Sequence, residues 1–420
     1  MPLPPRIPEP RDQKFRGTIE LHVDATDTFH SLFRVSETVP IQSSGEMVLL
    51  YPEWETTSHS PTVSAIELAG LRAKIDGHDI EWRRDTIDIH AFRLTIPAGS
   101  HSLTLDFQYL PSRSSAKLRP EMVDVEWQHL LLYPAGWFTR DIPVVAQLEL
   151  PKGLRAFTAL TGLPILDSSA YFLAFAPETL DRLVDAPVYA ARYTRQLDLT
   201  SSFHVPVHLD LLADEPADLD VSPTDLGELQ ALVVQASKVF GAPPFRHYDA
   251  LVSLSDQLSP GGGLEHLDEG ENNLPANYFT ASGKQLNNRD LIAHEYIHAW
   301  NGRFRQPAGL WSPTFNRPTD PSMLWVYEGQ TECGAACSRP VPACARRNRL
   351  WIDLRATPHW PTHAVAARRR RSPTVHATFS TCPDTQLLGA TGNAERITTR
   401  KVFCYGSMLT RVCANSVKTR

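Results

Sequence analysis

Two histidines and a glutamate between residues 294 and 298 have the spacing of a helical metal site. His294 and His298 are four residues apart, so on an α-helix both imidazoles lie on one face and can bind the same ion. Glu295 stands beside the first histidine, where it can take a proton from water at the open position of the metal. This HExxH pattern predicts one Zn²⁺ per chain and a hydrolytic reaction, although the three residues can also fall at this spacing by chance.

A catalytic zinc ion usually has three protein ligands and leaves one position for water. The best candidate for the third ligand is Glu328, which opens a second predicted helix after the apolar run 323–326. Glu332 follows one helical turn later on the same face, so it could accept a hydrogen bond from a metal-bound histidine. The alternative for Glu328 is an ordinary solvated glutamate at the start of a helix.

A glycine-rich turn stands upstream of these residues and follows the predicted strand 248–254. Taken alone it is a weak signal, because glycine-rich turns are common and this one leads into an acidic stretch that could be a plain surface loop. The turn consists of Gly261, Gly262, Gly263, Leu264 and Glu265.

The segment 290–332 resembles the glycyl aminopeptidase family of bacterial metallopeptidases, which are gluzincins. The family pattern is HEYxHxWNxxRxxP followed by LWxxEG, and this chain matches it at His294, Glu295, Tyr296, His298, Trp300, Asn301, Pro307, Leu324, Trp325, Glu328 and Gly329. The arginine of the pattern falls at Phe304, one residue before Arg305. The resemblance implies that zinc binds to His294, His298 and Glu328. It also implies that Glu295 is the general base.

The resemblance extends to the glycine-rich turn. In this family a GGxEH segment forms the edge strand of the active site, and its glutamate holds the free α-amine of the substrate. Residues 261–265 are therefore expected to bind the substrate chain, with Glu265 as the amine anchor. Such a carboxylate pairs well with an ammonium group in a partly desolvated cleft and excludes internal peptide bonds. The implied activity is the release of amino-terminal residues, with small ones such as glycine and alanine preferred.

The elements that must position these residues follow from periodicity. Alternating apolar and polar residues predict an antiparallel β domain over residues 17–212. The period then becomes helical, from a capping Ser222 to a closing Gly241. We predict an α+β fold, in which an amino-terminal antiparallel β domain is followed by a truncated, thermolysin-like α/β catalytic domain over residues 220–336.

The start of the chain, residues 1–16, is rich in proline and polar residues, and we expect it to be disordered. It contains no apolar core of a signal peptide, so the sequence predicts a cytoplasmic protein, or an exported one if the true start lies upstream. No apolar run reaches the roughly 18 residues of a membrane span, so no transmembrane helix is predicted. The sequence does not indicate an oligomeric state.

The composition changes abruptly near residue 333. All 6 cysteines lie from this residue onward, where 13 arginines and 2 lysines stand against 2 aspartates and 1 glutamate, although the whole chain has a net charge of −6. At face value, residues 337–420 are a basic, cysteine-containing tail that could form disulfides. The run Arg368–Arg371 could bind nucleic acid, but we consider this the weakest hypothesis and predict no nucleic-acid partner.

Translation out of frame explains the tail better. Reverse translation of residues 395–420 with GC-rich codons, read in another frame, can give HHYSKGFLLWLDADAGLRELGEDA, which resembles the family's downstream YYSxGxLxWLDxD segment. The shift would begin near Cys333–Cys337, just after the last predicted ligand. A tyrosine in the family segment is a plausible oxyanion donor, and Thr398 and Thr399 stand at the corresponding codons here. Loss of one such donor typically lowers the rate by about 10²–10³.

Two alternatives to an active aminopeptidase therefore stay open. One is a zinc-binding remnant of such an enzyme with impaired catalysis. The other is a β-rich binding module for which the peptidase half is only a scaffold. Metal content measured together with hydrolysis of glycyl or alanyl substrates distinguishes the first from an active enzyme. Ligand binding that survives His294→Ala and chelation would favour the second.

Overall fold

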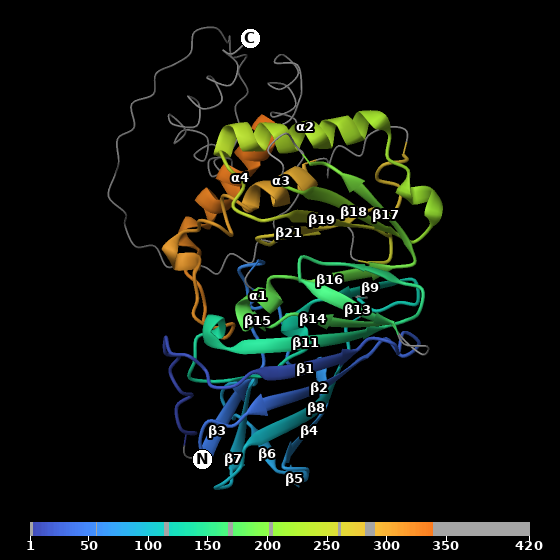
Figure 1. The fold of residues 1–420 in the computed structure, drawn as a ribbon. Helices are drawn as coiled ribbons and strands as arrows, with labels where there is room; N and C mark the ends of the chain where they lie inside the picture. The colour runs from blue at the N-terminus through green and yellow to red at the C-terminus, as the bar shows by residue number, and fades with distance from the viewer. Residues whose placement is uncertain are drawn as a thin grey trace, which may run out of the picture. The chain divides into compact units, whose positions relative to one another are not determined.

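The fold is α+β, as predicted, with a mainly antiparallel β domain followed by a mixed sheet that carries the helices (Figure 1). The structure, a computed structural model, describes residues 3–55, 57–112, 117–166, 171–200, 205–258, 262–281 and 290–338. The tail 339–420 and the hypotheses concerning it lie outside the described residues.

The largest sheet of the described part of the chain has the strand order β13-β14-β11-β1-β2-β8-β4-β5, with β15 paired to β11. Neighbouring strands are antiparallel except for β1 and β11, which are parallel. The predicted alternation places every second side chain of β2 in the core. The strands are β1 (Ile19–Asp24), β2 (Phe33–Pro40), β4 (Leu68–Ile75), β5 (His78–Ile80), β8 (Ser102–Tyr109), β11 (Pro143–Leu150), β13 (Gly162–Leu166), β14 (Tyr171–Phe175) and β15 (Glu178–Thr179).

Two smaller sheets complete the β domain, and their inner faces share one apolar core with the largest sheet. The first sheet contains β10 (Tyr133–Pro134), β3 (Gly45–Leu50), β7 (Ala91–Ile96) and β6 (Trp82–Arg84). The second contains β12 (Arg155–Phe157), β16 (Val188–Ala191) and β9 (Met122–Val125). A short helix, α1 (Leu180–Val184), and two 3₁₀ turns, Trp127–His129 and Thr139–Asp141, connect these strands.

The start of the chain corrects a prediction. Residues 3–16 are not disordered but extend along the β domain. The backbone N–H of Arg11 donates to the carbonyl of Gly136 at 3.2 Å, and Phe15 is fully buried in the core. Prolines have a fixed φ and lose little backbone entropy on folding, so a few contacts are enough to order such a segment.

The second sheet system positions the predicted site. Its strand order is β17-β18-β19-β21-β20, so β20 lies at the edge. The strands are β17 (Tyr193–Asp198), β18 (Val207–Ala213), β19 (Tyr248–Leu254), β21 (Glu269–Leu274) and β20 (Gly262–Glu265). Strands β18, β19 and β21 are parallel, whereas β17 and β20 run antiparallel to their neighbours. Every residue of β19 is buried, as expected for a central parallel strand covered on both faces.

Three helices cover one face of this sheet, and the β domain lies on the other side (Figure 1). They are α2 (Pro223–Phe240), α3 (Leu291–His298) and α4 (Leu324–Ser338), with 3₁₀ turns at Pro216–Leu219, Ala308–Leu310 and Pro321–Met323. The predicted helix start is present, because the Ser222 hydroxyl accepts a hydrogen bond from the Asp225 backbone N–H at 3.1 Å. Gly241, with φ of 88°, closes the helix.

The sheet begins earlier in the chain than the periodicity suggests. Alternation around residues 205–211 predicts one more strand of the β domain, but the structure pairs β18 with β19. A strand period of two shows that a segment is extended without showing which sheet it joins.

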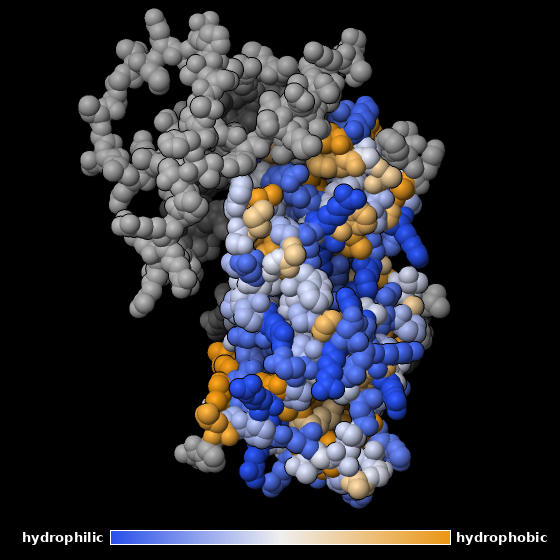
Figure 2. All heavy atoms as spheres, turned by 90° about the vertical axis from the view of Figure 1, so that its left-hand side faces the viewer, coloured by the Kyte–Doolittle hydropathy of each residue, from blue (hydrophilic) through white to orange (hydrophobic). Residues whose placement is uncertain are grey.

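The surface drawn in Figure 2 is mostly hydrophilic, with apolar side chains in separate small groups. In the described part of the chain, no helix combines the length and the apolar character needed to cross a membrane.

Candidate active site

Helix α3 holds the two predicted histidines on a rigid base. Ile292, Ala293 and Ile297 are buried in the core between the helices and the mixed sheet. The opposite face carries His294 and His298, whose Nε2 atoms lie 2.9 Å apart. Packing on one side of the helix therefore fixes the direction in which both imidazoles point on the other.

Glu328 completes a three-residue cluster from the first turns of α4. Its Oε2 lies 3.1 Å from His294 Nε2 and 3.5 Å from His298 Nε2. Burial opposes ionisation of Glu328, but hydrogen bonds from both histidines outweigh it and hold the pKa of this carboxyl well below its ordinary value. An ionised carboxylate and two imidazoles converging on one point are a donor set that fits zinc in a catalytic site.

The outer nitrogen of each imidazole also faces a hydrogen-bond acceptor. His294 Nδ1 lies 3.1 Å from Glu332 Oε2, and His298 Nδ1 lies 3.0 Å from the carbonyl oxygen of Asn301. Such contacts orient the ring and leave Nε2 free to bind a metal. The Thr331 hydroxyl lies 3.3 Å from His298 Nδ1 and was not anticipated from the sequence.

Glu295 is buried against the edge strand of the mixed sheet. A Cβ atom on Gly263 would overlap the Glu295 carboxylate, so glycine allows β20 to pass directly beside this side chain. Burial raises the pKa of Glu295 to about 7, although the two neighbouring histidines lower it. A carboxyl with a pKa near neutrality can both accept and release a proton during a reaction.

The edge strand also supplies Glu265, whose side chain is buried. Its Oε1 accepts a hydrogen bond from the Tyr327 hydroxyl at 2.6 Å. Burial favours the neutral acid, but hydrogen bonds and nearby histidines outweigh it and lower the pKa of Glu265 below its ordinary value. Gly262 and Leu264 belong to the same strand, while Gly261 lies outside the described residues.

The acidic residues that follow this strand are not a solvated loop. Glu269 and Glu271 are fully buried in β21. Glu271 contacts His266 at 3.0 Å and accepts a hydrogen bond from the Tyr189 hydroxyl at 2.7 Å. Since Tyr189 belongs to β16, these contacts join the mixed sheet to the β domain.

The β domain also contributes a residue that the sequence analysis did not select. His59 Nε2 lies 3.5 Å from Glu265 Oε1 and 3.9 Å from Glu328 Oε1. No periodicity or spacing marks His59, because its place depends on contacts between segments far apart in the chain.

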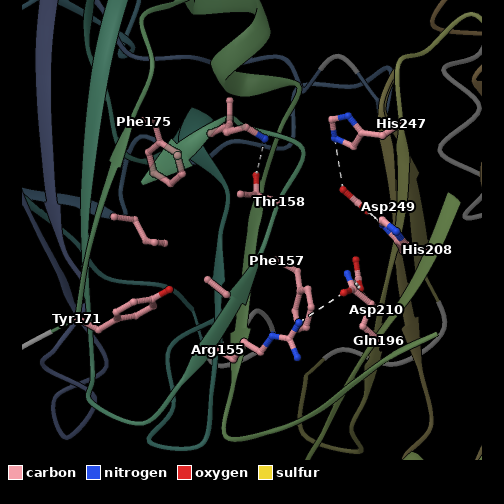
Figure 3. Close-up of a pocket in the computed structure, with 14 residues that line it drawn as sticks. Arg155, Phe157, Thr158, Tyr171, Phe175, Gln196, His208, Asp210, His247 and Asp249 are labelled. Carbon is pink, nitrogen blue, oxygen red and sulfur yellow. Dashed lines mark hydrogen bonds and ion pairs between the residues drawn. The ribbon is translucent and has the colours of Figure 1, made fainter. Parts of the chain in front are cut away.

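A separate cavity of about 380 Å³ lies between β12 and β14 on one side and β17, β18 and β19 on the other (Figure 3). Phe157, Tyr171 and Phe175 form an apolar wall, and polar side chains such as His208, Asp210 and Asp249 face it. His294, His298 and Glu328 do not line this cavity. It is therefore distinct from the candidate metal centre.

Two parts of the chain match known protein families. Residues 20–192 match the Peptidase M61 N-terminal domain, and residues 287–337 match the M61 glycyl aminopeptidase domain. Comparison with curated proteins gave no match.

A solved structure of another protein has a similar fold. An aminopeptidase N family protein from Idiomarina loihiensis is similar with a TM-score of 0.64 and 20% identity, covering 76% of this chain and 54% of that one. The chain thus spans about half the length of that protein. An M1 zinc metallopeptidase from Deinococcus radiodurans, a mutant bound to a Tyr-Ser-Ala substrate, gives a TM-score of 0.49 and 16% identity, covering 83% of this chain and 76% of that one.

Proposed function

Because the chain belongs to the M61 glycyl aminopeptidase family, we propose that it is a zinc-dependent aminopeptidase acting on peptides with a free amino terminus. The observation that carries the proposal is the convergence of His294, His298 and Glu328 beside the buried Glu295. The preference for small residues such as glycine and alanine rests on the family alone.

The three converging side chains would hold one zinc ion. When bound there, zinc would polarise a water molecule and the carbonyl of the scissile bond. Glu332 and the Asn301 carbonyl would hold the imidazole rings in the orientation that presents Nε2.

Glu295 is proposed to move the proton. Its carboxylate would accept a proton from the attacking water and then donate it to the nitrogen of the leaving amine. Burial raises the pKa of Glu295 to about 7 in the absence of metal. A bound zinc ion would lower this pKa and favour the carboxylate that accepts the proton.

Glu265 is proposed to bind the free amino terminus of the substrate. Its carboxylate is buried, ionised and held at one oxygen by the Tyr327 hydroxyl. An ammonium group would pair with it, whereas an internal peptide bond would leave the carboxylate buried without a partner. Strand β20 would supply backbone groups to the peptide from the open edge of the sheet.

Metal content and hydrolysis, measured on the same preparation, test the proposal. We expect one equivalent of zinc and release of the first residue from alanyl and glycyl amides. Glu295→Gln should keep the zinc and lose about 10²-fold or more in kcat. Zinc binding without hydrolysis by the wild-type chain would indicate the impaired remnant. Absence of zinc binding would overturn the proposal.

A further inference from the structure

His59 reaches the candidate site from the β domain without a hydrogen-bond partner among the described residues. Its side chain is 5% exposed, and neither ring nitrogen makes a hydrogen bond. A buried polar group without a partner destabilises a fold, so such a group calls for an explanation.

The backbone at His59 is also unusual, with φ of 51° in the left-handed region. A residue other than glycine in this region costs free energy and persists only where its surroundings enforce it. The surrounding loop is tightly bonded: Glu55 and Ser60 form a β-bridge, and the Ser58 hydroxyl contacts those of Ser60 and Thr62, each at 3.2 Å. The loop therefore holds the imidazole in one place.

Two carboxylates and an aromatic ring surround that place. His59 Nε2 faces Glu265 Oε1 at 3.5 Å and Glu328 Oε1 at 3.9 Å, and the ring packs edge-on against Tyr327 with centroids 4.8 Å apart. The distance to Glu265 is longer than a normal hydrogen bond. Hydrogen bonds in active sites are often long in the free protein and shorten when the substrate binds.

We propose that His59 is a positioning residue, which donates a hydrogen bond from Nε2 to Glu265 and so orients the carboxylate that reads the amino terminus. This inference rests on the proposed aminopeptidase function. With Tyr327 and His59 both directed at Oε1, the second oxygen of Glu265 is left for the substrate ammonium group. The β domain thereby takes part in the choice between free and blocked amino termini.

The test compares an alanyl amide substrate with its N-acetylated form. The wild-type chain should strongly prefer the free amine, and His59→Phe should lower this preference by about tenfold or more, mainly through KM. His59→Gln keeps a donor at similar reach and should restore most of the preference. His30→Gln, an exposed histidine substitution in the same domain, serves as the control.

A second measurement does not depend on hydrolysis or metal. In the zinc-free chain, ligand-observed NMR should show binding of alaninamide to the wild type and His59→Gln, weaker binding to His59→Phe, and none of acetylated alaninamide. If the wild type binds alaninamide but hydrolyses nothing with zinc, the proposed function fails and the role of His59 stands. If His59→Phe keeps the wild-type preference and binding, or if the wild-type chain binds no amine, the role of His59 is refuted.

Discussion

At the scale of single residues, neighbouring hydrogen-bond partners fix the orientation of the candidate site side chains. Glu332 and the Asn301 carbonyl face the outer nitrogens of the two histidines, and Tyr327 holds Glu265. These contacts reduce the freedom of each side chain before a metal or a peptide arrives. Pre-organisation of this kind lowers the entropy lost on binding.

If the proposed zinc site forms, the contact between Glu332 and His294 should make its metal affinity depend on the Glu332 carboxylate. We predict that Glu332→Gln weakens zinc binding by about tenfold or more, because the ring loses a charged acceptor at Nδ1. Competition with a chromophoric chelator measures the affinity. Glu228→Gln on the exposed face of α2 should have no effect, and equal affinities for the two variants would contradict the prediction.

A buried acid far from the site makes stability depend on pH. Burial raises the pKa of Glu37 to about 8, against a smaller lowering by the hydrogen bond from the Leu132 N–H at 2.9 Å. An acid with a raised folded-state pKa stabilises the fold while it is protonated. Its contribution is complete below its unfolded pKa of about 4.5 and is lost as the pH rises towards 8.

Glu37→Gln keeps an acceptor oxygen and cannot ionise. We predict that its free energy of unfolding, relative to the wild type, rises by about 2–4 kcal/mol between about pH 5 and pH 9. Urea unfolding at the two pH values measures the difference. Glu20→Gln, exposed on β1, is the matched control. Parallel pH dependence in Glu37→Gln and the wild type would refute the prediction.

At the scale of elements, local sequence signals predicted where a helix begins and ends, but they did not predict which elements contact one another. Ser222 and Gly241 mark the two ends of α2, because capping depends on neighbouring residues. The sheet joined by β18, the burial of Glu271 and the approach of His59 depend on contacts distant in sequence. Such contacts cannot be predicted from the pattern of residues 205–211 or from a single histidine, because they depend on residues far away in the chain.

The close passage of β20 and α3 gives an element-scale prediction. Gly263→Ala places a methyl group against the Glu295 carboxylate, so strand and helix must move apart. We predict that kcat/KM falls by about 100-fold while zinc content stays unchanged. Gly227→Ala in α2 meets nothing within 4 Å and should retain full activity. Equal losses in the two variants would show that the close approach is unimportant.

At the scale of the whole molecule, the β domain and the domain of the mixed sheet both contribute residues to the candidate site. The match to the M61 glycyl aminopeptidase domain stops at residue 337. Beyond residue 333 the composition becomes basic and rich in cysteine. We predict that the gene carries an insertion or deletion between codons 325 and 345, relative to close relatives. Sequencing this region tests the prediction, and a single frame shared with relatives would contradict it. A frame-restored chain should hydrolyse alanyl amides faster than the present one.

His59 and α4 are far apart in the chain, and this separation determines when the candidate site can form during synthesis. A growing chain contains the imidazole of the β domain long before the helix with Glu328 leaves the ribosome. Contacts so distant in sequence form late and slowly during folding, because a long loop must close first. An unfinished chain would therefore lack the proposed zinc site, and the proposed hydrolysis would begin only after α4 has packed against the β domain.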